Sequence, residues 1–481
     1  MPIPTVPPRV PIDEPLNHGT RAATRGVRRS ILRLLAGEVG NGSFRFLATV
    51  LLARAMAPAD YGLLNVAIAL SGFGLVACSL GLPELGAREA AIAPERAGWL
   101  GGRALSARVT SLTVVGVTGT VVTAAAWPGH VMLVTLAAVM AIIMATSSDW
   151  LARGLERMAL AAAASTLGGL ALLGGAIAIT AGRPGTELAL TIFVAAEGIR
   201  AAVFWLRLHR VLRFRLGFTG ARPLLVRARP LALSGLLIYS YYANLDTVVL
   251  AATRSQREAG LYSAPYRLFL VFNLVGVFAA YSALPYLARQ AAMGAHDAAN
   301  RLLRALLAGL AAYGVVALAL VEIVGPNLLR MLFGTRFGLA FPTFVLLTAG
   351  AAWYSVGIPA GYSLIALGQN RRFLVGAGVA GCLNLVLDIV LIPPLGLPGA
   401  GLATLIAFVV AANVWLAVRG LISGRSLGVL LALSGSSAGA ILIADRAGAR
   451  LPIGVITLVM GGALAAISIG SRPSSADGAG R

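Results

Sequence analysis

Long runs of apolar residues recur along the chain and are separated by short polar stretches. We count fourteen such runs of about 17–25 residues, the length at which a helix crosses a hydrocarbon core of about 30 Å. The runs are continuous rather than alternating, which predicts helices and not a β-barrel. The expected spans are 37–56, 62–80, 105–126, 131–149, 158–181, 188–206, 231–252, 266–288, 304–324, 341–366, 373–392, 399–420, 427–443 and 452–470. The pattern therefore predicts an all-α polytopic membrane protein.

Composition agrees with this class and excludes a nucleic-acid-binding protein. Hydrophobic residues make up 58% of the chain and charged residues 12%, against about 25% charged in a soluble domain. The net charge of +21 comes from arginines spread over short loops, and no single domain gathers them. We therefore expect membrane lipids, and no nucleic acid, as partners.

The distribution of arginine predicts the orientation in the membrane. The N-terminal tail holds six arginines and the loop 207–229 holds seven, whereas most of the alternate loops are poor in arginine. The positive-inside rule places the rich side, and with it both termini, in the cytoplasm. All 39 basic residues are arginine in an alanine- and glycine-rich chain, which indicates a bacterial source and thus the bacterial cytoplasmic membrane. Residues 1–35, with six prolines in the first fifteen positions, are expected to form a disordered basic tail.

An internal repeat predicts the domain organisation. Residues 49–64 (TVLLARAMAPADYGLL) align without a gap on residues 247–262 (TVVLAATRSQREAGLY), at an offset of 198. Six helices separate the two copies, so both begin on the same side, as in transporters built from two parallel repeats around a cavity. The expected parts are an N-lobe over 36–206, an arginine-rich linker over 207–230, a C-lobe over 231–420, two further helices over 421–471 and a cytoplasmic tail over 472–481.

Several segments resemble the bacterial polysaccharide-biosynthesis membrane proteins. They are 60–89 (DYGLLNVAIALSGFGLVACSLGLPELGARE), 229–268, 328–337 (LLRMLFGTRF) and 364–404, and the likeness covers most of 36–420. The resemblance is to lipid-linked oligosaccharide flippases of the O-antigen or teichuronic-acid type, in the multidrug/oligosaccharidyl-lipid/polysaccharide exporter superfamily. It implies that an undecaprenyl-diphosphate-linked glycan crosses from the inner to the outer leaflet by alternating access. It also implies glycosyltransferases and a glycan polymerase of the same pathway as partners.

The substrate that the resemblance implies is strongly anionic, and arginine holds phosphate oxygens bidentately. Arg45 is the best candidate, because it shares one face of the first helix with Glu38 and Asn41. The alternatives are an ion pair with an acid on a neighbouring helix, or an Arg45 side chain that reaches the cytoplasmic side.

The seventh predicted helix carries a matching row of polar residues, Tyr239, Tyr242 and Asp246. The tyrosines are candidates for stacking on sugar rings, and Asp246 for contact with glycan or for binding a proton or Na⁺. Alternatively, Asp246 pairs with Arg267 and joins the seventh helix to the eighth.

Other polar residues within the spans are candidates for the cavity lining or for structure. Asn384 and Asp388 share a face of the eleventh helix, and Asn273 lies in the eighth. Buried amides also form ordinary interhelical hydrogen bonds of about 0.6 kcal/mol. Glu197 and Arg200, three residues apart, can satisfy each other.

No pattern of an enzyme, cofactor or metal site is recognisable. The four histidines lie in tails or loops, and the spacing of the two cysteines suits neither a disulfide framework nor a metal site. A cation-coupled multidrug exporter is the alternative, although its N-lobe cavity would be acidic rather than basic. A membrane glycan polymerase or ligase is a further alternative, against which the short outside loops argue.

Overall fold

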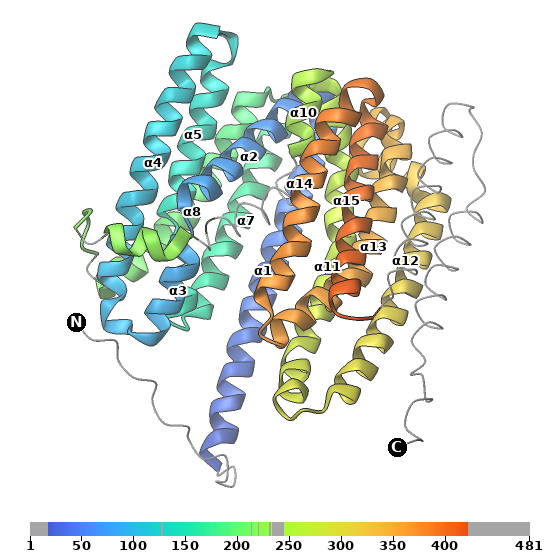
Figure 1. Cartoon of the computed structure of the whole chain (residues 1–481). Helices are drawn as coiled ribbons and strands as arrows, with labels where there is room; N and C mark the ends of the chain where they lie inside the picture. The colour runs from blue at the N-terminus through green and yellow to red at the C-terminus, as the bar shows by residue number, and fades with distance from the viewer. Residues whose placement is uncertain are drawn as a thin grey trace, which may run out of the picture.

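The computed structural model describes residues 18–421 apart from 127, 213, 220, 230–231 and 233–244, and its elements there are helices (Figure 1). The helices of the first half are α1 His18–Ala55, α2 Pro58–Ser79, α3 Leu82–Ile92, η1 Pro94–Arg96, α4 Ala97–Ala126, η2 Pro128–His130, α5 Val131–Thr146, α6 Asp149–Gly154, α7 Met158–Thr180 and α8 Thr186–Leu212. Those of the second half are α10 Leu245–Thr253, α11 Gln256–Ala292, α12 His296–Phe333, η3 Thr335–Ala340, α13 Phe341–Ala366, α14 Asn370–Leu395 and α15 Leu397–Val418. The all-α class is confirmed.

Ten helical stretches of the described residues are long and apolar enough to cross a membrane. They coincide with the second to sixth and the eighth to twelfth predicted spans, so the chain is a multi-pass membrane protein. The first predicted span lies in α1, and the described part of the seventh is α10. The two C-terminal spans and the tail 472–481 lie outside the described residues.

Two features differ from the sequence-based expectation. Residues 18–35 form the first part of α1, whereas we expected a disordered tail from 1 to 35. The prolines end at position 15, and the alanine, leucine and arginine that follow are good helix formers. The short helices α3 and α6 lie where we expected loops, because 11 and 6 residues are too few to register as spans.

The long helices pack as two bundles. In the first, α1 lies along α7, and α2, α4, α5 and α8 complete the contacts. In the second, α13 packs against α11, α12 and α15, while α14 packs on α15 and α10. The bundles meet chiefly through α2 and α11, with smaller contacts of α2 with α10 and of α1 with α12. We call the bundle of α1 to α8 the N-bundle and the bundle of α10 to α15 the C-bundle.

Glycine makes the close contact between α2 and α11 feasible. A Cβ atom on Gly62 would lie 2.0 Å from the carbonyl oxygen of Gln256, and one on Gly260 would lie 1.8 Å from that of Pro58. Any larger side chain at either position would push the helices apart. Gly62 and Gly260 are equivalent positions of the predicted repeat, at its offset of 198 residues.

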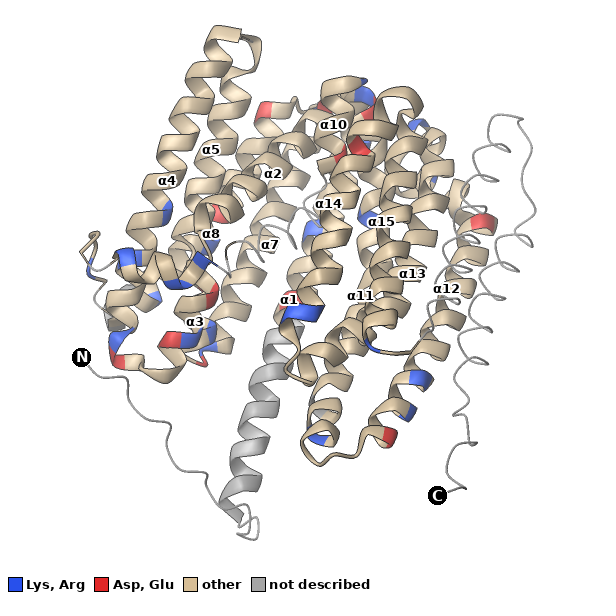
Figure 2. Cartoon of the chain, viewed as in Figure 1, with Lys and Arg blue, Asp and Glu red and all other residues tan. Residues whose placement is uncertain are grey.

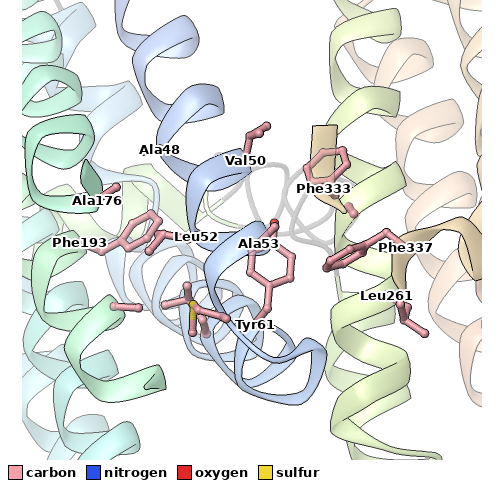
Figure 3. Packing of buried hydrophobic residues seen from close by; sticks show 14 of the residues in the cluster. Ala48, Val50, Leu52, Ala53, Tyr61, Ala176, Phe193, Leu261, Phe333 and Phe337 are labelled. Carbon is pink, nitrogen blue, oxygen red and sulfur yellow. The ribbon is translucent and has the colours of Figure 1, made fainter. Parts of the chain in front are cut away.

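A cluster of buried apolar residues from both bundles packs at the same end of the molecule. Figure 3 shows residues of α1 and α2 facing Phe333, Phe337 and Leu261 of the C-bundle. The Tyr61 ring meets that of Phe337 edge-on, with the ring centroids 6.0 Å apart. This end holds the C-terminus of α1 and the N-terminus of α11, which the arginine distribution predicts to be the outer side.

Candidate functional site

The first polar cluster lies within the N-bundle and centres on Glu197 of α8. Arg45 of α1 forms an ion pair with Glu197, and Arg200 lies 3.3 Å from the other carboxylate oxygen. Arg45 also donates from Nε to Oδ1 of Asn41, at 3.2 Å. Glu197 is 2% exposed, whereas the side chain of Arg45 remains 29% exposed. The predicted polar face of the first helix is therefore turned towards α7 and α8, and the predicted Glu197–Arg200 pair is present.

Further ion pairs extend this cluster towards the arginine-rich side of the bundle. Arg200 approaches Asp149 of α6 at 3.6 Å, and Arg153 lies 3.1 Å from the same carboxylate. Arg153 also reaches Glu38 of α1 at 3.6 Å. Three arginines and three acids thus alternate, and their formal charges cancel. A buried carboxylate such as Glu197 is tolerated because it is paired in this way.

The second cluster lies in the C-bundle and consists of two buried carboxyl groups. Asp246 of α10 is 4% exposed and Asp388 of α14 is fully buried. Packing of α10 against α14 brings the two carboxyl groups close together in the C-bundle. Figure 2 shows acidic segments near the point where α10 meets α14, with basic segments close by, and blue and red also mix around α3. Two carboxylates this close repel each other unless a proton or cation lies between them.

Two hydroxyl groups bond to Asp246, whereas Asp388 accepts no hydrogen bond from the described residues. Tyr262 donates to Asp246, and Thr404 of α15 donates to the same oxygen at 3.0 Å. Among the described residues, neither carboxyl oxygen of Asp388 has a hydrogen-bond partner, and the side-chain amide nitrogen of Asn384 has none either. Buried oxygens without donors are suited to coordinating a small cation or to holding a proton.

The suggested pairing of Asp246 with Arg267 is wrong. Arg267 instead donates to Oδ1 of Asn65 on α2, at 2.7 Å, and so connects the two bundles. Asp246 instead accepts hydrogen bonds from Tyr262 and Thr404. The structure therefore leaves Asp246 with its other predicted role, as a candidate for contact with glycan or for binding a proton or Na⁺.

Among the remaining candidates, only Asn273 lies within the described residues. Asn273 is buried on α11, and neither end of its amide has a hydrogen-bond partner in the described part of the chain. Tyr239 and Tyr242 lie outside the described residues.

Four residues of these contacts were missed by sequence reasoning. Tyr262 and Thr404 complete the environment of Asp246, Asn65 receives Arg267, and Arg108 is buried in α4. Hydroxyl and amide groups are common in membrane helices and carry no charge, so nothing in their local pattern marked them. Arg108 is a charge within an apolar run, which is a signal that was available.

A sequence model for polysaccharide biosynthesis proteins matches residues 27–291, more than half of the chain. The chain belongs to this family. The comparison with curated protein sequences gives no match.

Solved structures of membrane transporters share the fold. The lipid II flippase MurJ in an inward closed conformation superposes with a TM-score of 0.63 at 14% identity, covering 90% of this chain and 97% of MurJ. An inward-facing multidrug resistance MATE transporter superposes with a TM-score of 0.60 at 14% identity, covering 83% of this chain and 95% of that transporter. The MATE transporter VcmN of Vibrio cholerae superposes with a TM-score of 0.52 at 15% identity, covering 84% of this chain and 98% of VcmN. The fold is thus that of transporters and flippases rather than of an enzyme.

Proposed function

We propose that this protein moves an undecaprenyl-diphosphate-linked oligosaccharide or polysaccharide precursor from the inner to the outer leaflet of the bacterial cytoplasmic membrane. The observation that carries the proposal is Arg45, which lies on a helix of the N-bundle with 29% of its side chain exposed. Its ion pair with Glu197 fixes the guanidinium while leaving part of it free for phosphate oxygens. Membership of the polysaccharide biosynthesis family supports the glycan as cargo.

The contacts between the bundles support alternating access. Three contacts join the bundles at the predicted outer end: Gly62 with Gly260, Asn65 with Arg267, and Tyr61 with Phe337. A transporter held together at this end opens towards the cytoplasm, where the glycan carrier is made. Breaking these contacts and forming others at the opposite end would expose the cargo to the outer leaflet.

The carboxyl pair of the C-bundle supports coupling to a cation. A proton or Na⁺ at Asp246 and Asp388 would remove their repulsion, and Asn384 and Thr404 would supply further oxygen atoms. Binding there changes the packing of α10 against α14 and α15, which gives the ion a route to bias one arrangement of the bundles. Glycosyltransferases and a polymerase of the same pathway would supply and consume the cargo.

The test is a flipping assay in proteoliposomes with a fluorescent undecaprenyl-diphosphate-linked oligosaccharide. A membrane-impermeant quencher reports the fraction in the outer leaflet. We expect Arg45→Ala to slow flipping more than tenfold, because the charge-assisted contacts with phosphate are lost. Arg45→Lys should retain part of the activity, and Arg88→Ala, an exposed arginine of α3, should retain all of it.

A double variant separates transport from folding. Arg45→Gln with Glu197→Gln removes both charges of the pair, so neither member is left without its partner, and Arg200 keeps Asp149 as a counter-charge. If this variant folds normally and flips at the wild-type rate, Arg45 has no part in moving the cargo.

The buried carboxyl pair also favours a second candidate, a cation-coupled multidrug exporter. The same proteoliposomes distinguish the two functions. Efflux of a cationic dye driven by a Na⁺ or proton gradient, with no movement of the labelled glycan carrier, would establish the exporter in place of the flippase.

A further inference from the structure

The arginine-rich linker lies folded against the N-bundle. Beyond the end of α8 its described residues are 214–219 and 221–229, and the latter form a short helix that Figure 1 draws in green near α3. Leu224 and Ala228 of this helix are buried in one cluster with Leu85 of α3 and Leu100 of α4. This part of the linker is therefore a surface element with a fixed place on the N-bundle.

The backbone of the linker follows the beginning of α4 closely. The backbone N–H of Arg215 donates to the carbonyl oxygen of Gly98 at 3.3 Å, and that of Gly217 donates to the hydroxyl of Ser106 at 2.9 Å. A Cβ atom on Gly102 would lie 2.1 Å from the carbonyl oxygen of Arg215, so this approach requires glycine. These contacts hold the linker against residues 98–106.

The length of α4 gives the depth of that contact in the membrane. α4 has 30 residues and is about 45 Å long, against about 30 Å for the hydrocarbon core. Its residues 109–126 carry no charge and extend over about 27 Å, so they fill the core. Residues 98–106, with the linker on them, then lie in the head-group layer of the arginine-rich side, predicted to be cytoplasmic.

An aromatic residue in the same stretch agrees with this depth. Trp99 lies near the beginning of α4, with the guanidinium groups of Arg96 and Arg103 5.6 and 5.9 Å from its ring centroid. Tryptophan is enriched where the head groups of a bilayer meet its apolar core. The first turns of α4 thus have the composition of a membrane interface.

The outward surface of the linker combines arginine with large apolar side chains. We call it the linker surface, and its members are Arg215, Leu216, Phe218, Arg222, Val226 and Arg229. Leu216 is 62% exposed and Phe218 is 56% exposed, which is unfavourable in water. At a membrane surface the apolar groups enter the acyl boundary while the arginines meet phosphate.

Neighbouring acids do not balance the charge of the linker. Residues 207–229 contain seven arginines and no acid. Residues 82–103 contain three arginines and three glutamates, and residues 147–157 contain two arginines and two acids, so neither neighbour adds net charge. Among the described residues, Arg227 pairs with Glu89, whereas Arg222 and Arg229 form no ion pair. A surplus of positive charge at head-group depth matches the anionic lipids of a cytoplasmic leaflet.

We propose that the linker surface docks on anionic phospholipid head groups of the inner leaflet, with Arg222 and Arg229 contacting phosphate and Phe218 entering the acyl boundary. Lipid is favoured over a soluble acidic partner because the surface adjoins α4, whose exposed Val117 and Val121 face lipid. The linker surface takes no part in the proposed transport of cargo, so its docking is expected whether or not the protein is a flippase.

A fluorescent label on the linker surface tests the proposal in the full-length protein. Cys78 and Cys382 are replaced by alanine, and bimane is attached through Val226→Cys, because Val226 lies between the two arginines. The protein is reconstituted in phosphatidylcholine vesicles with increasing amounts of brominated phosphatidylglycerol or brominated phosphatidylcholine. Quenching by each brominated lipid then reports which head group lies beside the label. We expect stronger quenching by phosphatidylglycerol, whereas equal quenching by both lipids, or by neither, overturns the proposal.

A double variant tests the arginines. We expect Arg222→Gln with Arg229→Gln to lower the preference for phosphatidylglycerol by up to about fivefold for each arginine, the usual contribution of one arginine near an anionic surface. Arg222→Lys with Arg229→Lys should keep the preference, which separates loss of charge from a folding defect. A preference that survives the glutamine substitutions unchanged overturns the assignment of these arginines.

The hairpin of α11 and α12 provides matched controls. α11 has 37 residues and is about 55 Å long, more than the roughly 40–45 Å of a whole bilayer, so its end extends beyond the head groups. Arg289→Gln with Arg301→Gln removes two exposed arginines there and should leave the preference at Val226 unchanged. Bimane attached through Met293→Cys, at a side chain that is 66% exposed, should be quenched by neither lipid. Equal quenching at positions 226 and 293, or an equal loss of preference in both double variants, contradicts docking at the linker surface.

Discussion

The N-bundle and the C-bundle both bury carboxylates, but they compensate them differently. Glu197 is 2% exposed and has Arg45 and Arg200 beside it. Asp388 is fully buried, and its interacting neighbour is a second acid, Asp246, rather than a base. The N-bundle cluster is neutral through its own residues, whereas the C-bundle cluster needs a charge from outside. The comparison separates a cluster that the chain neutralises itself from one that, under the proposed function, a proton or cation from outside would neutralise.

The largest effect on transport is expected in the C-bundle, where the charge that balances the buried carboxyl groups would come from outside the chain. Asp388→Asn removes the repulsion between the two carboxyl groups and with it the reason to bind a cation. We expect the wild-type protein to gain thermal stability on addition of Na⁺ or on acidification, since either relieves the repulsion. The variant should lose this response and lose ion-driven transport more than tenfold.

The measurement is the melting temperature of purified protein across Na⁺ concentration and pH. Asn384→Leu serves as a matched variant, since it removes an uncharged oxygen from the same helix face and should weaken the response without removing it. An Asp388→Asn protein that still responds fully to both cations would show that this pair is not the coupling site.

An intermediate effect, on stability, is expected in the N-bundle, where removing one charged side chain leaves its partners without a counter-charge. Glu197→Gln leaves Arg45 and Arg200 close together without the acid between them. Breaking a fully buried ion pair costs about 3–5 kcal/mol, and partial exposure of both arginines reduces this to roughly 2–3 kcal/mol. Thermal unfolding should show the loss, and unlike Asp388→Asn it should appear at every Na⁺ concentration. A stability equal to that of the wild type would mean that the arginines are solvated without Glu197.

The sequence predicted the helices well, because span length and apolar composition are local properties. It also identified Glu197 with Arg200 and Asn384 with Asp388, whose spacing along one helix already determines their proximity. It failed where partners come from distant segments: Arg267 bonds to Asn65, 202 residues away, and Asp246 bonds to Thr404, 158 residues away. Hydrophobic patterning determines which face of a helix is buried but not which helix covers it.

The smallest effect on stability is expected at the solvent-exposed end of the N-bundle cluster. Arg153→Gln removes two ion pairs, to Asp149 at 3.1 Å and to Glu38 at 3.6 Å, in which the arginine is 48% exposed. Exposed pairs contribute about 0.2–1 kcal/mol and are screened by salt. The melting temperature should therefore fall only slightly, and the difference should shrink in high salt. Arg200 still neutralises Asp149 in this variant, so a loss as large as that of Glu197→Gln would mean that the cluster acts as one cooperative unit rather than as a gradient from buried to exposed pairs.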